Sequence, residues 1–203
     1  HESDFQVSSL VTKENEVSYS DQKILEAEKI GSRPAWIANA TSFRFPESRL
    51  PKIAIVIDDA GLNKTMTKYA INLPGPLTIS FMSYASRLEQ QVNLAKKAGH
   101  EVIAHIPMEP FNSSLNPGPR FLSTRDSDKQ ILKNFRWSLS RVPGIVGVNN
   151  HMGSRFTSDK RGMKIIMSEL KKQGLLFLDS RTSISTIGVK LAKKFGVPHA
   201  ARN

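Results

Sequence analysis

Residues 53–61 read Ile-Ala-Ile-Val-Ile-Asp-Asp-Ala-Gly, and this stretch decides the fold expected of the rest of the chain. Five small or β-branched apolar residues in a row predict a strand buried on both faces, as in a parallel sheet. Asp58 and Asp59 cannot continue into an apolar layer, so they should emerge at the carboxyl end of the strand, where α/β folds carry their chemistry. In the structural alternative, one Asp caps a helix that begins near Leu62 and the other is solvated.

The composition is that of a globular protein. The chain has 203 residues, of which 39% are hydrophobic and 23% charged, enough for one domain with a full core and an appendage. Its longest apolar runs are strand-sized, so no transmembrane segment is predicted. The absence of cysteine excludes disulfides and thiolate metal sites and suits an oxidising compartment such as a periplasm. Because the chain begins at His1, we expect a processed product whose targeting segment is not seen.

The positive charge is concentrated in one part of the chain. Residues 1–50 carry six Lys or Arg against eight Asp or Glu, whereas residues 51–203 carry 23 against 10. Such a surplus favours anionic partners, including acidic glycans, phospholipid headgroups and nucleic acid. Nucleic acid is disfavoured because no basic run is interleaved with aromatic residues. The structural alternative is that lysine pairs such as Lys96-Lys97 and Lys171-Lys172 lie on the polar faces of amphipathic helices.

Two regions are expected. Residues 1–50 form a polar arm or linker with a short helix around Asp21 to Ile30, and Trp36, Phe43 and Phe45 can dock this arm on the domain. Residues 51–203 form the domain itself, in which strand and helix patterns alternate. The predicted strands are 53–57, 77–81, 101–105, 145–148 and 175–178, and the predicted helices are 62–72, 86–98, 127–141, 158–173 and 186–195.

This alternation predicts an α/β fold with a parallel sheet and right-handed crossovers. Residues 197–201 begin a sixth strand close to the last residue, which suggests that the fold is incomplete at its carboxyl end. The segment from Ile106 to Asp126 is longer than an ordinary connection between a strand and a helix. It could form one wall of a groove, where Phe111 and Phe121 stack on the rings of a ligand or bury the underside of the loop.

Acidic and imidazole side chains follow four of the predicted strands. Because parallel strands end at one edge of a sheet, this edge should gather Asp58 and Asp59, His105 with Glu109, His151, and Asp179. The carboxylate of Asp59 and the imidazoles of His105 and His151 make a zinc-type ligand set with an open position for water or substrate. A single histidine is more often structural than a ligand, and we interpret His100 and His199 in that way. Three such residues at strand ends favour a metal or catalytic site.

Four blocks of sequence resemble the divergent polysaccharide deacetylase family, a branch related to the NodB-type carbohydrate esterases. They are residues 53–61, Gly-His-Glu-Val-Ile-Ala-His-Ile-Pro-Met-Glu-Pro at 99–110, Gly-Val-Asn-Asn-His-Met-Gly-Ser-Arg-Phe-Thr at 147–157, and Leu-Phe-Leu-Asp-Ser-Arg-Thr at 176–182. The resemblance covers residues 51–203 and implies an irregular (β/α) barrel. Many members of the family are exported to the bacterial envelope, so the resemblance also implies a periplasmic or other extracytoplasmic location.

The resemblance also implies roles for the site residues. Asp58 would be the base, and Asp59 would bind the metal. NodB-type enzymes place two metal-binding histidines four residues apart, but here that spacing holds His105 and Glu109, so His151 would complete the ligand set. The late histidine acid of those enzymes lies beyond Asn203 or is absent, and their block of Arg and Pro-aromatic residues has no clear match. The other site residues expected are Glu109, Asp179 and Arg181 as catalytic residues and Asn150, Arg155 and Ser180 as substrate-binding residues.

In these roles, Arg155 or Arg181 would stabilise the oxyanion of the tetrahedral intermediate. Glu109 or Asp179 would orient a metal-binding histidine or protonate the leaving amine. Both arginines could instead neutralise the acidic edge. The function implied is metal-dependent deacetylation, with zinc as the best match, of an envelope polysaccharide or peptidoglycan-like glycan. Acidic polymers are included among the candidate substrates. The alternative is a catalytically inactive protein that keeps the barrel and serves in glycan binding or envelope assembly. The oligomeric state is left open.

Overall fold

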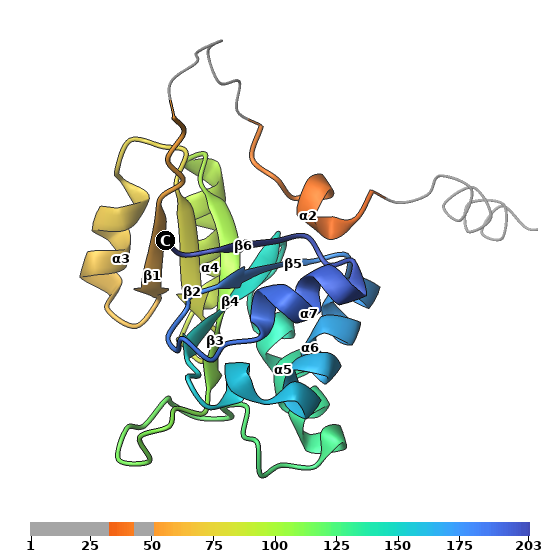
Figure 1. The fold of residues 1–203 in the computed structure, drawn as a ribbon. Coiled ribbons are helices and arrows are strands. Elements are labelled where there is room, and N and C mark those ends of the chain that lie inside the picture. The colour runs from red at the N-terminus through yellow and green to blue at the C-terminus, as the bar shows by residue number, and fades with distance from the viewer. Residues whose placement is uncertain (1–32, 43–50) are drawn as a thin grey trace, which may run out of the picture. The chain divides into compact units, whose positions relative to one another are not determined.

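A six-stranded parallel sheet forms the centre of the computed structural model, which describes residues 33–42 and 51–203 (Figure 1). The strands follow one another across the sheet in chain order, and each pairs in parallel with the next. Within the described residues, β1 and β6 remain at the two edges of the sheet, which is therefore not closed. The strands are β1 (Val56–Ala60), β2 (Thr78–Met82), β3 (Glu101–Met108), β4 (Gly147–Met152), β5 (Leu176–Asp179) and β6 (His199–Ala201).

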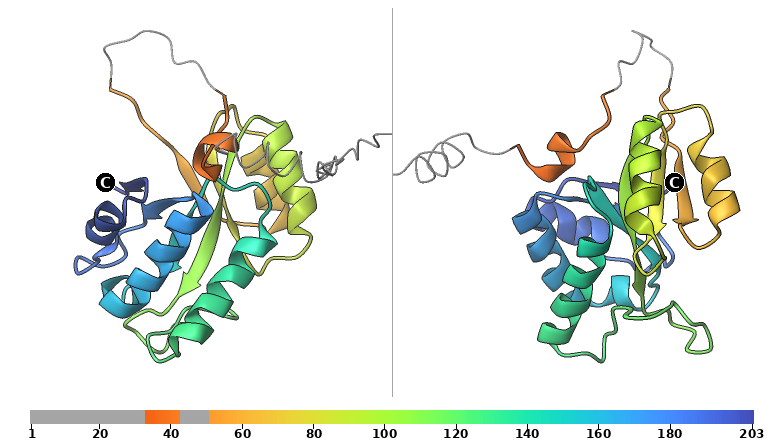
Figure 2. Two further views of the ribbon diagram at one scale, coloured as in Figure 1. Left: turned by 90° about the vertical axis from the view of Figure 1, so that its right-hand side faces the viewer. Right: turned by 180° about the vertical axis from the view of Figure 1, so that it is seen from behind.

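Helices connect the strands and lie around the outside of the curved sheet (Figures 1 and 2). They are α3 (Lys64–Ile71), α4 (Leu88–Lys97), α5 (Asp128–Arg141), α6 (Lys160–Gln173) and α7 (Gly188–Phe195), with a 3-10 turn, η1 (Phe156–Ser158), before α6. Each is within a few residues of a predicted helix. Side chains of Ser127 and Asp159 accept hydrogen bonds at the first turns of α5 and α6, and Gly174 and Gly196 end α6 and α7. The predicted α/β alternation is therefore confirmed.

The two faces of the sheet differ in chemistry. Along β3, Val102 and its alternate neighbours up to Met108 join the hydrophobic core with Val92 of α4 and Phe135 of α5. Side chains alternate between the faces of a strand, so His105 lies on the opposite, inner face. His105 pairs in register with Asn149 of β4, and both are buried. The inner face of the central strands therefore carries the polar residues.

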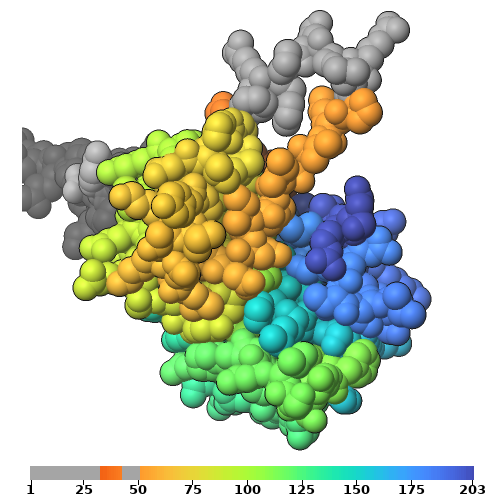
Figure 3. Space-filling model, turned by 90° about the vertical axis from the view of Figure 1, so that its left-hand side faces the viewer, coloured from red at the N-terminus to blue at the C-terminus, as the bar shows by residue number. Residues whose placement is uncertain are grey.

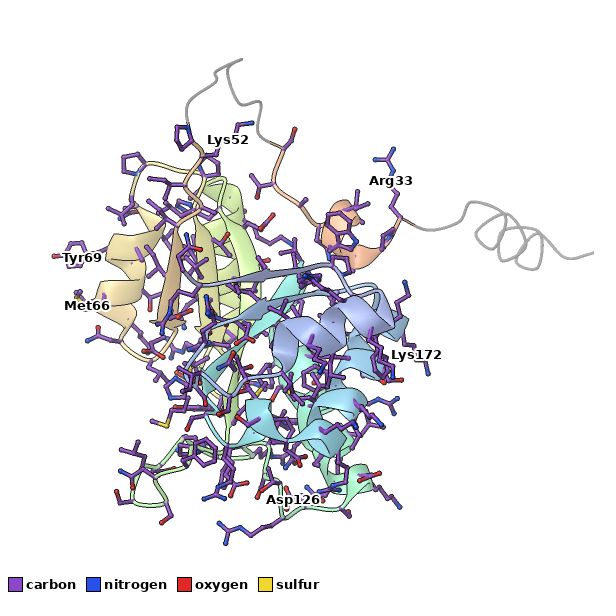
Figure 4. The ribbon with its side chains drawn as sticks, in the orientation of Figure 1. Arg33, Lys52, Met66, Tyr69, Asp126 and Lys172 are labelled. Carbon is purple, nitrogen blue, oxygen red and sulfur yellow. The ribbon has the colours of Figure 1, made fainter. Side chains whose placement is uncertain are left out.

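The amino-terminal end of the 53–61 stretch is not a buried strand. The strand begins only at Val56, and Ile53 and Ile55 are 85% and 55% exposed. The expectation of burial on both faces is wrong because β1 is an edge strand that pairs with β2 alone. The next helix, α3, also has exposed apolar side chains. Figure 4 shows two of them, Met66 and Tyr69, pointing away from the sheet.

A β-bulge in β1 contains Asp58 and Asp59. Ile57 pairs with Ile79 and Ala60 with Phe81, so two aspartates on β1 lie opposite the single residue Ser80 on β2. Asp59 has a left-handed backbone with φ of 61°. In a regular strand these neighbours would point to opposite faces, and the bulge allows both carboxylates to lie on the inner side. The alternative in which one of the two aspartates caps the next helix is wrong, because Asn63 caps α3 by accepting from the Met66 N–H.

Part of the arm contacts the domain. In α2 (Ala35–Ala38), the N–H of Trp36 donates to the carbonyl of Gly174 at 2.9 Å. The side chain of Asn39 donates to the carbonyl of Ile145 at 2.9 Å. Trp36 is half-buried, as expected for docking, and residues 34–203 form one compact unit. The predicted helix at 21–30 and the residues Phe43 and Phe45 lie outside the described residues. None of the helices in the described ranges is long and apolar enough to span a membrane.

The left-handed backbone at Asp59 predicts an unusual order of stability. Asp59→Gly and Asp59→Ala both remove the carboxylate, so the difference between them reports the backbone alone. We expect Asp59→Gly to be more stable than Asp59→Ala by about 1–2 kcal/mol, because a Cβ is unfavourable in the left-handed region. Urea unfolding in the presence of a chelator measures both. In a regular strand the order would be reversed, and that order would contradict the bulge described here.

Candidate metal centre

Three side chains from three strands converge at the inner face. Oδ1 of Asp59 lies 3.4 Å from Nε2 of His105 and 3.1 Å from Nδ1 of His151. The two imidazole rings meet edge to face, with centroids 5.0 Å apart. All three ligand atoms lie within 4.8 Å of one another. His105 is buried, His151 half-buried and Asp59 exposed, so the centre has a protein side and a solvent side.

These distances fit a metal ion. Ligand atoms about 2.0–2.1 Å from a tetrahedral zinc lie about 3.3 Å from one another. The two separations from Asp59, 3.4 and 3.1 Å, are close to that value. One carboxylate and two imidazoles leave a fourth position open toward solvent, which is the arrangement of catalytic rather than structural zinc sites.

The charge states of the ligands also suit a cation. The neighbouring His105 is the main cause that lowers the pKa of Asp59, against the opposing effect of partial burial, and His151 acts in the same direction. Burial lowers the pKa of His151, and the neighbouring His105 lowers it further, although both aspartates oppose this shift. At neutral pH the centre therefore holds an ionised carboxylate and a neutral His151 imidazole, the forms that bind a metal.

Asp58 is held beside the three ligands by Asn149. Its Oδ1 accepts a hydrogen bond of 2.8 Å from Nδ2 of Asn149 and lies 3.9 Å from Nδ1 of His105. Oδ1 of Asn149 is 2.7 Å from Nδ1 of His105 and accepts a bond of 2.6 Å from the hydroxyl of Ser80. We did not expect roles for Asn149 and Ser80 from sequence. Asn149 lies two residues before His151 on β4, so strand alternation alone would have placed it on the same face.

Glu109 is bound by the loop that follows β3. Its Oε2 accepts bonds from the N–H and hydroxyl of Thr124 at 2.6 and 2.7 Å and from the hydroxyl of Ser123 at 3.1 Å. Burial raises the pKa of Glu109, but these bonds and the charge of Arg125 outweigh burial and lower it. Oε1 lies 3.6 Å from Nε of Arg155. Glu109 is thus an ionised anchor of the loop, and it is not among the three ligands that converge.

Asp179 and Asn150 bind the loop between β5 and α7. The fully buried carboxylate of Asp179 accepts from the N–H of Arg181 at 2.9 Å and from the hydroxyl of Thr186 at 2.8 Å. Oδ1 of Asn150 accepts from the N–H of Ser180 at 2.9 Å. Arg181 is exposed and donates to the carbonyl of Arg202 at 3.4 Å. These contacts connect the expected site residues to the loop rather than to the three metal-ligand candidates.

Arg155 lies beside the long loop, between Glu109 and Phe111. Its guanidinium carbon is 5.2 Å from the centroid of the Phe111 ring, and Nη2 donates to the Phe111 carbonyl at 3.3 Å. Phe111 is 50% exposed and Phe121 half-buried. A cation beside the loop and an exposed ring on it are therefore available for a ligand.

The two aspartates border a cavity between β1 and α3 that neither His105 nor His151 lines. It has a volume of about 360 Å³ and is lined by Ile57, Asp58, Asp59 and Ala60 of β1 and by residues of α3 that include Met66. On the face in Figure 3, β1 (orange) lies beside the segment near residue 150 (cyan) and above the long loop (green). A larger cavity, of about 510 Å³, lies between α3 and α4, but none of the three ligand candidates lines it.

Comparisons with known proteins agree with the sequence resemblance. The family model for divergent polysaccharide deacetylases matches residues 55–203. The uncharacterized protein YibQ of Escherichia coli is 33% identical over 146 residues, which are 72% of this chain and 46% of YibQ. An uncharacterized protein of Haemophilus influenzae is 32% identical over 158 residues, or 77% of this chain and 55% of the relative. The chain thus spans about half the length of these curated relatives.

A solved structure has the same fold. The crystal structure of an uncharacterized protein from Agrobacterium tumefaciens superposes with a TM-score of 0.78 at 29% sequence identity. The match covers 83% of this chain and 69% of that protein. The open parallel sheet is consistent with an incomplete barrel of the NodB type.

The centre predicts that the protein binds one zinc ion. We expect Asp59→Asn and His151→Ala to weaken zinc binding by more than about 100-fold, because changes beside a metal's ligands already cost 10–100-fold. Competition with a chromophoric chelator measures the affinity. His199→Ala is the control, since His199, on β6, contacts the carbonyl of Val197 rather than the centre. Equal affinities in all four proteins would exclude this metal centre.

The anchoring of Glu109 predicts a pH-dependent loss of stability in Glu109→Gln. A carboxylate whose pKa is lowered by folding stabilises the protein above its unfolded pKa, about 4.3, and loses that contribution as the pH falls through the lowered value. We therefore expect Glu109→Gln to be less stable than the wild type by about 1–3 kcal/mol at neutral pH, with the difference shrinking in acid. Urea unfolding across this pH range measures it. A difference independent of pH would contradict the anchoring role.

Proposed function

Because this chain belongs to the divergent polysaccharide deacetylase family, we propose that it hydrolyses acetyl groups on an envelope polysaccharide or peptidoglycan-like glycan. The observation that carries the proposal is the convergence of Asp59, His105 and His151 beside a second carboxylate, Asp58. The three would hold a divalent metal, for which zinc is the best match. Such an ion would polarise the acetyl carbonyl and lower the pKa of a water molecule.

Asp58 is the proposed general base. Its bond from Asn149 occupies Oδ1, and 41% of its side chain is exposed, so the carboxylate can reach a water molecule at the open side of the centre. Having taken a proton, the Asp58 carboxyl is also the proposed donor for the leaving amine or alcohol. Glu109 is less suited to that step, because its lowered pKa keeps it ionised.

The basic surface supports an acidic polymer as the substrate. Residues 51–203 carry 23 Lys or Arg against 10 Asp or Glu, and such a field draws polyanions toward the protein. Arg155 with Phe111 is the proposed contact for a sugar ring and its carboxylate, while Asn150, Ser180 and Arg181 position the loop at the carboxyl end of β5. An extracytoplasmic location, as is typical of the family, fits a chain without cysteine.

One observation favours a second function, glycan binding or envelope assembly without turnover. Glu109 occupies the position where the NodB-type spacing has a metal-binding histidine, and it is bound to Thr124 and Ser123. A protein that has given up this ligand could keep the barrel and the metal while losing the reaction. Acetate release therefore separates the two functions.

The proposal predicts acetate release by the zinc-loaded protein from peptidoglycan fragments or from an acetylated acidic polysaccharide. We expect Asp58→Asn to lower kcat by about 10²–10⁴-fold, since it removes a general base. Zinc affinity should be retained, because Asp58 is not one of the three ligands. Asp128→Asn, which removes an exposed carboxylate paired with Arg161, is the control and should turn over like the wild type.

Acetate is measured by an enzyme-coupled assay, and binding of the same glycans by calorimetry. Saturable binding without acetate release would support the non-catalytic function instead. Turnover that survives Asp58→Asn would leave the deacetylase activity standing and remove Asp58 as its base.

A further inference from the structure

We infer that Asn149 is a positioning residue that assigns different roles to the adjacent carboxylates Asp58 and Asp59, an inference that rests on the proposed deacetylase function. Its side chain lies between the proposed base and a proposed metal ligand. It makes short contacts with Asp58, His105 and Ser80. Asn149 can both donate and accept hydrogen bonds, through its NH₂ group and its carbonyl oxygen.

The contact with Asp58 fixes the orientation of the amide. The NH₂ nitrogen of Asn149, which can only donate, lies 2.8 Å from Oδ1 of Asp58 and donates to it. The carbonyl oxygen of the amide then faces the other way. The hydroxyl of Ser80 donates to that oxygen at 2.6 Å, which is consistent with the same orientation.

The orientation of the amide fixes the tautomer of His105. Because the amide oxygen carries no proton, Nδ1 of His105, 2.7 Å away, must be an N–H group that donates to it. The neutral ring then has its lone pair on Nε2, the nitrogen 3.4 Å from Asp59. A metal ligand needs its lone pair directed at the ion, and Asn149 supplies the partner that holds it there.

The same contact keeps Asp58 apart from the ligands. Oδ1 of Asp58 is 3.9 Å from Nδ1 of His105, beyond a hydrogen bond, because the amide lies between these groups. Asp59 is free of Asn149 and lies against both imidazoles. Asn149 is 1% exposed and Ser80 is fully buried, so water cannot readily replace either contact. Asparagine suits this position because one side chain offers a donor to the base and an acceptor to the ligand.

Two substitutions test the contact with His105 and the contact with Asp58 separately. Asn149→Leu removes both contacts, so we expect His105 to lose its preference for the Nδ1–H tautomer and zinc affinity to fall by about 10–100-fold. Asn149→Asp keeps an acceptor for His105, removes the amide donor to Asp58 and sets a second carboxylate against it. For Asn149→Asp we expect an unchanged tautomer and a zinc affinity close to that of the wild type, because the acceptor that orients His105 is kept, but a kcat lowered by about 100-fold through misplacement of Asp58.

The tautomer is read from nitrogen-proton correlation spectra of histidine-labelled protein, with zinc bound and without metal at a pH where imidazole is neutral. Zinc affinity is read by chelator competition. Asn134→Leu is the matched control, since it removes another buried asparagine, on α5, and should change neither readout. If Asn149→Leu fails to fold, Asn149→Ala, which removes the same two contacts, replaces it in the test of His105, while Asn149→Asp still tests Asp58.

An unchanged tautomer and zinc affinity in Asn149→Leu would overturn the inference for His105, and wild-type kcat in Asn149→Asp would overturn it for Asp58. A wild-type protein that releases no acetate would instead contradict the proposed function. The tautomer and affinity measurements would still decide whether Asn149 orients His105.

Discussion

The bulge in β1 is the constraint on which the centre depends. A strand cannot direct two successive side chains to one face, yet Asp58 contacts Asn149 and Asp59 contacts His105 on the same inner face. The left-handed backbone of Asp59 makes this possible, at a cost of about 1–2 kcal/mol for a residue with a Cβ. The turn that follows is fixed by the hydroxyl of Thr67, which accepts from the N–H of Gly61 and donates to the carbonyl of Asn63. Such local strain persists where the surrounding structure determines the conformation, and it is common at functional sites.

The carboxylates near this edge of the sheet fall into two pairs: one pair holds loops in place, and the other lies at the metal centre. Glu109 and Asp179 are buried and are bound by N–H and hydroxyl groups of the loops after β3 and β5. Asp58 and Asp59 are the exposed pair, bordered by a cavity. Loops that are fixed by their own carboxylates give the three metal-ligand candidates a rigid surrounding, as an effective site requires.

Much of the fold could be predicted from the sequence, because hydrophobic runs and glycine stops mark the elements of a parallel α/β protein clearly. The position of β1 at the edge could not, since five apolar residues look the same in a central strand and in an edge strand. The bulge was also hidden, because its signal is a backbone angle at Asp59 rather than a residue type. Asp59, His105 and His151 were recognisable as metal-type residues at strand ends. Asn149 was not, because an amide neither titrates nor commonly binds zinc. Its importance lies in its contacts with Asp58 and His105.

The most direct measurement of the central claim is a crystal structure of the zinc-soaked protein with anomalous scattering recorded across the zinc edge. The account predicts one ion bound by Oδ1 of Asp59, Nε2 of His105 and Nδ1 of His151, with Asp58 still bonded to Asn149 and outside the ligand set. An ion held by Asp58 in place of Asp59, or no anomalous peak between β1, β3 and β4, would contradict it.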